Sequence, residues 1–287
     1  MERCLPGSPG LLVEPVSGEP PCAVLVLSGS SGRLEASRAR LLASHGAVAA
    51  AMAYFAGPGQ PPGLCEVPLE TFTPVLDELA QRSDHLAVWG ASKGAEAALL
   101  IAAADQRVRS VVAVAPTSHV WANTGPGRDG RERPWRSSWT RDGQPLPFLP
   151  LVDDWQARDD ERGAGGSVAV RGWYETSLAA APGPQVRAAA IPVEHIDGDV
   201  LLAAGGDDQV WPSVHFAEQI AARRGEHGRE TTVLVGERAG HRVLLPGESA
   251  RTDSGRGLLR GGDDRDDAEL GARLWRSTLG VLALGAR

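Results

Sequence analysis

Short apolar runs alternate with helical patterns along most of the chain. Cys22–Leu27 and Ser110–Ala115 are continuous apolar runs, which are typical of strands buried on both faces. Further strands are predicted at Val48–Phe55, Leu86–Trp89, Val200–Ala204 and Thr231–Val235. Helices are predicted at Ala36–His45, Leu69–Arg82, Ala95–Ala104, Ser213–Arg224 and Ala268–Leu284. This alternation predicts an α/β fold with a mainly parallel central sheet and helices on both faces.

The alternation fails between about residues 117 and 190. This segment has little periodicity and is rich in Trp, Arg, Gly, Pro and Asp. A segment of this length without regular structure is usually a functional lid or a disordered region. Disordered segments are poor in aromatic residues, but this one contains Trp121, Trp135, Trp139, Trp155 and Trp173. We therefore predict a Trp-rich insertion that forms a lid or pocket, within one domain over residues 1–287. A polar loop is predicted at residues 251–267.

Composition and charge narrow the classes of protein. A chain of 287 residues can bury a sizeable core. The formal net charge of −7 offers no basic surface for nucleic acid or an anionic membrane. No apolar run is long enough to span a bilayer, and the N-terminus lacks the apolar stretch of a signal peptide. We expect a cytoplasmic protein. Its many Arg, Ala and Gly residues and its single lysine suggest a GC-rich, bacterial genome.

The strongest local motif is Gly90-Ala91-Ser92-Lys93-Gly94, between a predicted strand and a predicted helix. This pattern is the G-x-S-x-G nucleophile elbow of the α/β-hydrolase fold. The sharp turn lifts the Ser92 hydroxyl clear of the sheet, and the glycines allow neighbouring backbone to approach closely. The N-terminus of the following helix offers N–H groups to a developing oxyanion. The alternative is a plain glycine turn with a capping serine.

A serine hydroxyl needs a base, and in this fold the chain order is nucleophile, acid, histidine. Asp208 follows a predicted strand, at the edge where α/β sheets form their sites. Asp207 is the competing acid, and both aspartates could instead cap the next helix. His241 follows the last predicted strand, where the base is expected, and the other histidines lie in less suitable positions. Ser92, Asp208 and His241 are therefore the candidate catalytic residues.

An acyl-transfer site also needs two donors that face the oxyanion. One is expected to be the backbone N–H of Lys93, the residue after the nucleophile. The other is expected from the glycine loop after the first predicted strand, where we choose Ser31. The side chain of Lys93 need not take part and is interpreted as a charged residue on the elbow helix.

Trp121, Trp139 and Trp211 are the candidate substrate-binding residues, because aromatic rings form large apolar walls. Packing of the insertion onto the sheet explains its tryptophans equally well. The insertion also carries a group of arginines that could bind a phosphate of coenzyme A or of a carrier protein, or could form a solvated face. These are Arg128, Arg131, Arg133 and Arg136.

Several segments resemble the catalytic domain of acyl-CoA thioesterases and bile acid-CoA:amino acid N-acyltransferases, in the same order over roughly residues 20–285. The clearest are Gly90–Glu96 (GASKGAE), Ile191–Ile196 (IPVEHI) and Gly205–Ser213 (GGDDQVWPS). The resemblance implies a Ser/Cys–Asp–His triad that forms a covalent acyl-enzyme from a thioester, and the matching residues are those already chosen. Two features depart from the family. We expect no N-terminal β-sandwich domain here, and the family's glycine-rich oxyanion loop is replaced by Ser30-Ser31-Gly32-Arg33.

The family's chemistry then depends on the nucleophile. An acyl-cysteine is itself a thioester and favours attack by amines, whereas an acyl-serine gives an amine less advantage over water. We therefore predict a serine hydrolase that cleaves an acyl-CoA or acyl-carrier thioester, with no metal or cofactor and with an acyl carrier protein as a possible partner. The alternatives are an esterase, lactonase, cyclase or acyltransferase of secondary metabolism, and a non-catalytic binding module.

Overall fold

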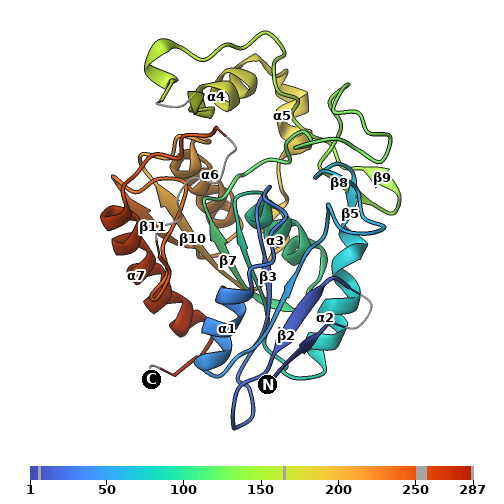
Figure 1. The fold of residues 1–287 in the computed structure, drawn as a ribbon, viewed down its shortest axis with the longest axis vertical. Coiled ribbons are helices and arrows are strands. Elements are labelled where there is room, and N and C mark those ends of the chain that lie inside the picture. The colour runs from blue at the N-terminus through green and yellow to red at the C-terminus, as the bar shows by residue number, and fades with distance from the viewer. Residues whose placement is uncertain (6–7, 164–165, 250–256, 286–287) are drawn as a thin grey trace.

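A mixed central sheet forms the centre of the computed structural model, which describes residues 1–5, 8–163, 166–249 and 257–285 (Figure 1). Eight strands lie in the order β1-β2-β4-β3-β6-β7-β10-β11. Their bounds are β1 Glu2–Cys4, β2 Gly10–Val13, β3 Ala23–Leu27, β4 Val48–Met52, β6 Leu86–Ala91, β7 Val108–Val114, β10 Asp199–Gly205 and β11 Thr232–Gly236. From β4 to β11 all neighbours are parallel, whereas β1–β2 and β2–β4 pair antiparallel.

Helices cover both faces of the sheet (Figure 1). They are α1 Ala36–Ser44, α2 Thr73–Ala80, α3 Lys93–Ala104, α4 Arg171–Ala180, α5 Gly183–Ala189, α6 Ser213–Glu226 and α7 Asp264–Val281. Short 3₁₀ turns lie at Leu69–Phe72, Asp159–Glu161 and Val193–His195. Helices α1 and α7 pack on one face, and α2, α3 and α6 pack on the other. The predicted α/β architecture is confirmed.

The apolar runs form strands because both of their faces are covered. In β3, Leu25 and Leu27 face the core beneath α2 and α3, while Val24 and Val26 face the core beneath α1 and α7. All four side chains are completely buried. Burial of one such side chain contributes about 1.5–3 kcal/mol, so this short strand fixes the middle of the sheet. The edge that contains its carboxyl end is where the candidate site lies.

The insertion forms an irregular cap over the carboxyl ends of the parallel strands, at the top of Figure 1. It contains α4, α5 and two short strands, β8 (Trp139–Arg141) and β9 (Gln144–Pro145). Strand β8 pairs with β5 (Val67–Pro68), which ties the insertion to the loop before α2. The predicted lid or pocket segment is therefore folded, with two helices that its sequence pattern did not reveal.

The polar loop predicted at residues 251–267 differs from the structure at its end. Residues 251–256 of that loop lie outside the described residues. Helix α7 begins at Asp264, four residues before the predicted start at Ala268, because the side chain of Asp263 accepts hydrogen bonds from the N–H groups of Arg265 and Asp266. The first turn of α7 is charged and has no apolar periodicity, so the sequence pattern predicted a loop there.

Candidate active site

Ser92 lies at a strained turn between β6 and α3. Its backbone has φ 57° and ψ −123°, a conformation that non-glycine residues rarely adopt and that is typical of a nucleophile elbow. The two glycines of the motif are sterically required. A Cβ at Gly90 would lie 2.1 Å from the carbonyl oxygen of Gly94, and a Cβ at Gly94 would lie 2.4 Å from that of Ser28. The elbow therefore packs directly against the loop that follows β3.

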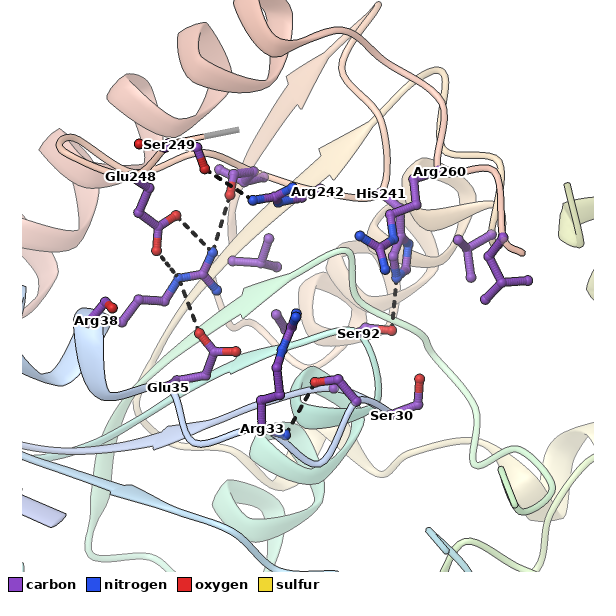
Figure 2. Close-up of a pocket in the computed structure, with 18 of the residues that line it drawn as sticks. Ser30, Arg33, Glu35, Arg38, Ser92, His241, Arg242, Glu248, Ser249 and Arg260 are labelled. Atoms are coloured by element: carbon purple, nitrogen blue, oxygen red, sulfur yellow. Dashed lines mark hydrogen bonds and ion pairs between the residues drawn. The ribbon is translucent and has the colours of Figure 1, made fainter. Parts of the chain in front are cut away.

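Hydrogen bonds join Ser92, His241 and Asp208 in a row. Ser92 Oγ lies 2.9 Å from His241 Nε2 (Figure 2), and His241 Nδ1 lies 2.8 Å from Asp208 Oδ2. Because an ionised carboxylate only accepts hydrogen bonds, Nδ1 carries the proton and Nε2 is left to accept the Ser92 hydroxyl. The three residues come from segments far apart in sequence, at the carboxyl ends of β6, β10 and β11.

Of the two neighbouring aspartates, Asp208 is the one beside the histidine. Its side chain is completely buried, and Oδ1 accepts the N–H groups of Val210 at 2.9 Å and Trp211 at 3.2 Å. Asp207 instead accepts a hydrogen bond from the side chain of Gln209 and another from the backbone of Gly262. The backbone donors stabilise the Asp208 carboxylate and fix the oxygen that faces His241.

His241 is held from its backbone and from its ring. Its N–H donates to the carbonyl oxygen of Arg260 at 2.8 Å, and the ring of Trp211 meets the imidazole edge-on at 5.5 Å. The preceding residue, Gly240, donates its N–H to Asp267 of α7 at 2.8 Å. Burial raises the pKa of Asp267 to about 6. The C-terminal helix thus contributes to the position of the base.

The backbone near Ser92 offers donors for an oxyanion. Lys93 is the first residue of α3, so its N–H has no acceptor within the helix. Gly29 approaches Ser92 closely, since a Cβ there would lie 3.0 Å from that of Ser92. Ser30, the next residue, borders both cavities that meet at Ser92, whereas the predicted Ser31 borders one of them. Ser30 is therefore a second candidate donor beside the predicted Ser31.

The first of these cavities is rich in arginine. It has a volume of about 360 Å³ and contains Ser92 and His241 in its wall. The charged residues that line it are Arg33, Arg38, Arg242, Arg260, Glu35 and Glu248 (Figure 2). Arg38 is bound to Glu248 at 2.8 Å and lies 4.4 Å from the ring of Trp89. Among the described residues that line it, four arginines face two glutamates, so this part of the arginine cavity is positive in a chain whose net charge is −7.

The second cavity is aromatic. It has a volume of about 260 Å³ and lies on the other side of Ser92, beneath the insertion. Its apolar wall consists of Trp135, Leu151, Val170, Trp173, Tyr174, Val210, Trp211 and Leu258. Trp155 does not line it but stacks on Trp173 with the ring centroids 5.7 Å apart. Five of these wall residues come from the insertion, so the segment does form a pocket wall.

The structure separates the three tryptophans chosen from the sequence. Trp211 lines the aromatic cavity. Trp121 and Trp139 have no exposed surface and line neither cavity. Trp139 packs against Tyr54 and Phe72 in the main core. These two rings therefore hold the insertion on the sheet. Trp135, Trp173 and Tyr174 line the aromatic cavity, where Trp121 and Trp139 were expected.

The arginines expected to meet a phosphate are mostly engaged with residues in or next to the insertion, and one of them, Arg133, lines the aromatic cavity. Arg136 pairs with Asp129 and Glu66, and Arg133 pairs with Asp153. Arg128 and Arg131 line neither cavity. The arginines beside Ser92 come instead from the loop after β3 and from the segment after His241. Their nearness in sequence to the catalytic motifs could have indicated them, since Arg242 directly follows the candidate base His241.

In the part of the chain that the structure describes, no group of three or more His, Cys, Asp or Glu side chains is arranged to hold a metal ion. No helix among the described residues combines the length and apolar character needed to cross a membrane.

Comparison with known proteins gives similarities in sequence. The family model described as BAAT / acyl-CoA thioester hydrolase C terminal matches residues 170–282. The chain is 28% identical over 277 residues to acyl-coenzyme A amino acid N-acyltransferase 2 of Rattus norvegicus, covering 93% of this chain and 61% of that protein. It is 27% identical over 229 residues to acyl-coenzyme A thioesterase 6 of Mus musculus, covering 78% and 49%. The chain thus spans about half to three fifths of these relatives.

Solved structures are similar in fold. A dienelactone hydrolase-like promiscuous phosphotriesterase from metagenomic libraries has a TM-score of 0.54 at 16% identity, covering 99% of both chains. A putative dienelactone hydrolase from Klebsiella pneumoniae has a TM-score of 0.54 at 15% identity, covering 99% of this chain and 97% of that one. The fold is that of the α/β-hydrolases. The resemblance to the BAAT and acyl-CoA thioester hydrolase C-terminal family, predicted from the sequence, is confirmed.

Proposed function

We propose that this chain is a serine hydrolase that cleaves an acyl thioester. The observation that carries the proposal is the hydrogen-bonded row of Ser92, His241 and Asp208 at a strained elbow. The similarity to acyl-CoA thioesterases supports a thioester as the substrate. The strained turn at Ser92 directs its hydroxyl toward His241. The buried carboxylate of Asp208, which accepts two backbone N–H groups, keeps the imidazole in the tautomer that accepts a proton.

In the first half of the reaction, His241 Nε2 takes the Ser92 proton as Oγ bonds to the thioester carbon. The carbonyl oxygen becomes an oxyanion that accepts the N–H groups of Lys93 and of Ser30 or Ser31. The carbonyl then re-forms, the C–S bond breaks, and the imidazolium gives its proton to the thiolate. In the second half, His241 takes a proton from water, whose oxygen attacks the acyl-serine. The ester bond to Ser92 breaks, its oxygen regains the proton, and the carboxylic acid leaves.

The direction of the substrate follows from the position of the base. His241 must reach both the leaving sulfur and the attacking water, and it lines the arginine cavity but not the aromatic cavity. The thiol portion therefore extends into the arginine cavity and the acyl portion into the aromatic cavity. Guanidinium groups bind phosphate and carboxylate in a bidentate manner. An anionic thiol such as coenzyme A fits this arrangement.

The test compares the protein with its Ser92→Ala variant on a panel of acyl-CoA thioesters. We expect thiol release by the parent and loss of at least about 10⁴-fold in the variant, with an unchanged melting temperature. Intact-mass measurement of Asp208→Asn should show an acyl adduct, which a Ser92→Ala/Asp208→Asn double variant lacks. Normal turnover by Ser92→Ala would overturn the proposal. Turnover of short-chain aryl esters without turnover of thioesters would favour a carboxylesterase instead.

A second candidate is transfer of the acyl group to an amino acid. It is favoured by the arginine cavity, which can hold the carboxylate of an acceptor once the thiol has left, and by the relative named as an amino acid N-acyltransferase. Against it, an acyl-serine ester gives amines little advantage over water. Product analysis by mass spectrometry, with glycine or taurine in excess, separates the two. Free acid alone supports the hydrolase, and N-acyl amino acid supports the transferase.

A further inference from the structure

A buried ion pair lies directly beneath the nucleophile. Lys93, the single lysine of the chain, places Nζ 2.9 Å from Glu96 Oε2. The side chains are 2% and 0% exposed. An isolated buried pair is costly, since desolvation of both charges offsets their attraction unless further hydrogen bonds satisfy them. The remaining partners of this pair therefore indicate what it does.

Those partners all belong to the insertion. Lys93 Nζ donates to Ser138 Oγ at 2.8 Å and to the carbonyl oxygen of Trp121 at 3.4 Å. Glu96 Oε1 accepts the indole N–H of Trp139 at 2.8 Å and the backbone N–H of Trp121 at 3.2 Å. The first turn of α3 is thus bonded to two separate segments of the insertion, one at Trp121 and one at Ser138 and Trp139. This turn includes the backbone N–H of Lys93, which the proposed mechanism uses.

The same network reaches the loop of the second donor. The hydroxyl of Tyr54 donates to the carbonyl oxygen of Ser28 at 2.5 Å, and the ring of Tyr54 lies 5.9 Å from that of Trp139. Ser28 is also the residue against which Gly94 packs. Trp139 therefore contacts, through Glu96 and through Tyr54, both segments that supply oxyanion donors.

We propose that Lys93, Glu96 and Tyr54 are positioning residues, which set the distance between the two oxyanion donors by tying both segments to the insertion. The inference rests on the proposed function. Apolar side chains of similar volume would fold at least as well as a buried ion pair, so stability alone does not account for it. What apolar side chains cannot supply is the set of directed bonds to residues 121, 138 and 139. Donors displaced by about 1 Å can lower the rate by about 100-fold.

The test separates position from stability. Single variants Lys93→Met and Glu96→Gln break the pair, and the double variant Lys93→Met/Glu96→Leu replaces it with apolar groups. Tyr54→Phe removes one hydroxyl only. The matched control is Arg224→Met, which removes another buried charge, bonded to the backbone carbonyls of Val193, Ile196, Gly198 and Glu230 and lining neither cavity. Each variant is measured for melting temperature, kcat and KM, and for inhibition by a trifluoromethyl ketone analogue, whose serine adduct mimics the oxyanion.

We expect the double variant to melt near the parent but to keep a kcat reduced by at least about tenfold, with KM nearly unchanged. Tyr54→Phe should lower kcat in the same way. The inhibition constant of the ketone should rise by the same factor as kcat/KM falls, because both report the oxyanion donors. Arg224→Met should lower the melting temperature while leaving the kcat of the folded enzyme unchanged.

The inference is overturned if the double variant and Tyr54→Phe have the parent's kcat, or if kcat falls only in proportion to lost folded protein, as in the control. If the double variant does not fold, the kcat values of Glu96→Gln and Tyr54→Phe test the inference instead, since both substitutions keep the size of the side chain. An active Ser92→Ala variant, or a parent that turns over no thioester, would overturn the proposed function and this inference with it. A parent-like kcat in the network variants, with Ser92→Ala inactive, overturns the inference alone.

Discussion

The two cavities that meet at Ser92 share four wall residues and differ in almost everything else. Ser30, Ser92, Val210 and Leu258 border both. The arginine cavity is formed by the loop after β3, the start of α1 and the segment after His241, which are parts of the sheet scaffold. The aromatic cavity is formed mainly by the insertion. In the proposed orientation, a substrate that spans Ser92 would meet the scaffold with its leaving group and the insertion with its acyl group, so selectivity for each could change independently.

A variant that disables the catalytic centre should lower turnover of every substrate, whichever cavity its parts occupy. For Asp208→Asn we expect kcat to fall by about 10⁴-fold for every substrate, because an amide no longer fixes the imidazole tautomer. KM for long and short acyl chains should keep its order, since both cavities are intact. Steady-state kinetics on two acyl-CoAs measures this. The control is Asp207→Asn, whose side chain does not touch His241. An equal loss in both variants would contradict the assignment of the acid.

The acyl side is tested by Trp173→Leu. We expect the ratio of kcat/KM for a long acyl-CoA to that for acetyl-CoA to fall by about 10-fold, because apolar wall area worth about 1.5–3 kcal/mol is partly lost. Trp155→Leu is the matched control, since Trp155 stacks on Trp173 without lining the cavity. A parallel loss for long and short chains would show that the insertion does not hold the acyl group.

The leaving-group side is tested by Arg260→Gln. We expect KM for an acyl-CoA to rise by a few-fold to about tenfold, because one charged hydrogen bond to an anionic thiol is lost. The neutral N-acetylcysteamine thioester of the same acyl group should be unaffected. Arg276→Gln on the exposed face of α7 is the control. If both thioesters lose equally, the arginine cavity does not recognise charge.

The smallest effect concerns the scaffold that holds His241. Burial raises the pKa of Asp267 to about 6, above its ordinary value, so the folded protein binds this proton more tightly than the unfolded chain. Stability therefore falls as the pH rises from about 4 to about 6, and the charged carboxylate destabilises the fold above that range. Asp267→Asn should raise the melting temperature by about 3 °C near pH 8. It should have little effect near pH 4.5. A gain at both pH values would contradict this cause.

Much of the sheet could be predicted from the sequence because its strands are continuous apolar runs, and the order of Ser92, Asp208 and His241 followed from the fold's chain order. The β1–β2 hairpin was missed. Strand β1 is only Glu2–Cys4, and its burial alternates too briefly to give a pattern. Helices α4 and α5 were missed because only Ser177 and Ala189 in them are buried, so packing against neighbours, not periodicity, stabilises them.

The finer features of the site depend on contacts that no local pattern contains. Lys93 was interpreted as a charged residue on the elbow helix, yet in the core it pairs with Glu96, which also accepts a hydrogen bond from Trp139. Trp121 and Trp139 could not be distinguished from Trp135 and Trp173, because all four lie in the same aperiodic segment. Which rings face a cavity is decided by side-chain directions and by the pairing of β5 with β8.

The anchoring of His241 to Arg260 and, through Gly240, to α7 has a consequence for biosynthesis. When Ser92 and Asp208 have left the ribosome during synthesis, Arg260 and helix α7, which position His241, have not yet been released. A nascent chain whose helix α7 has not yet been released would thus lack the contact that positions the base proposed to activate Ser92. Under the proposed function, catalysis therefore requires that α7 has docked.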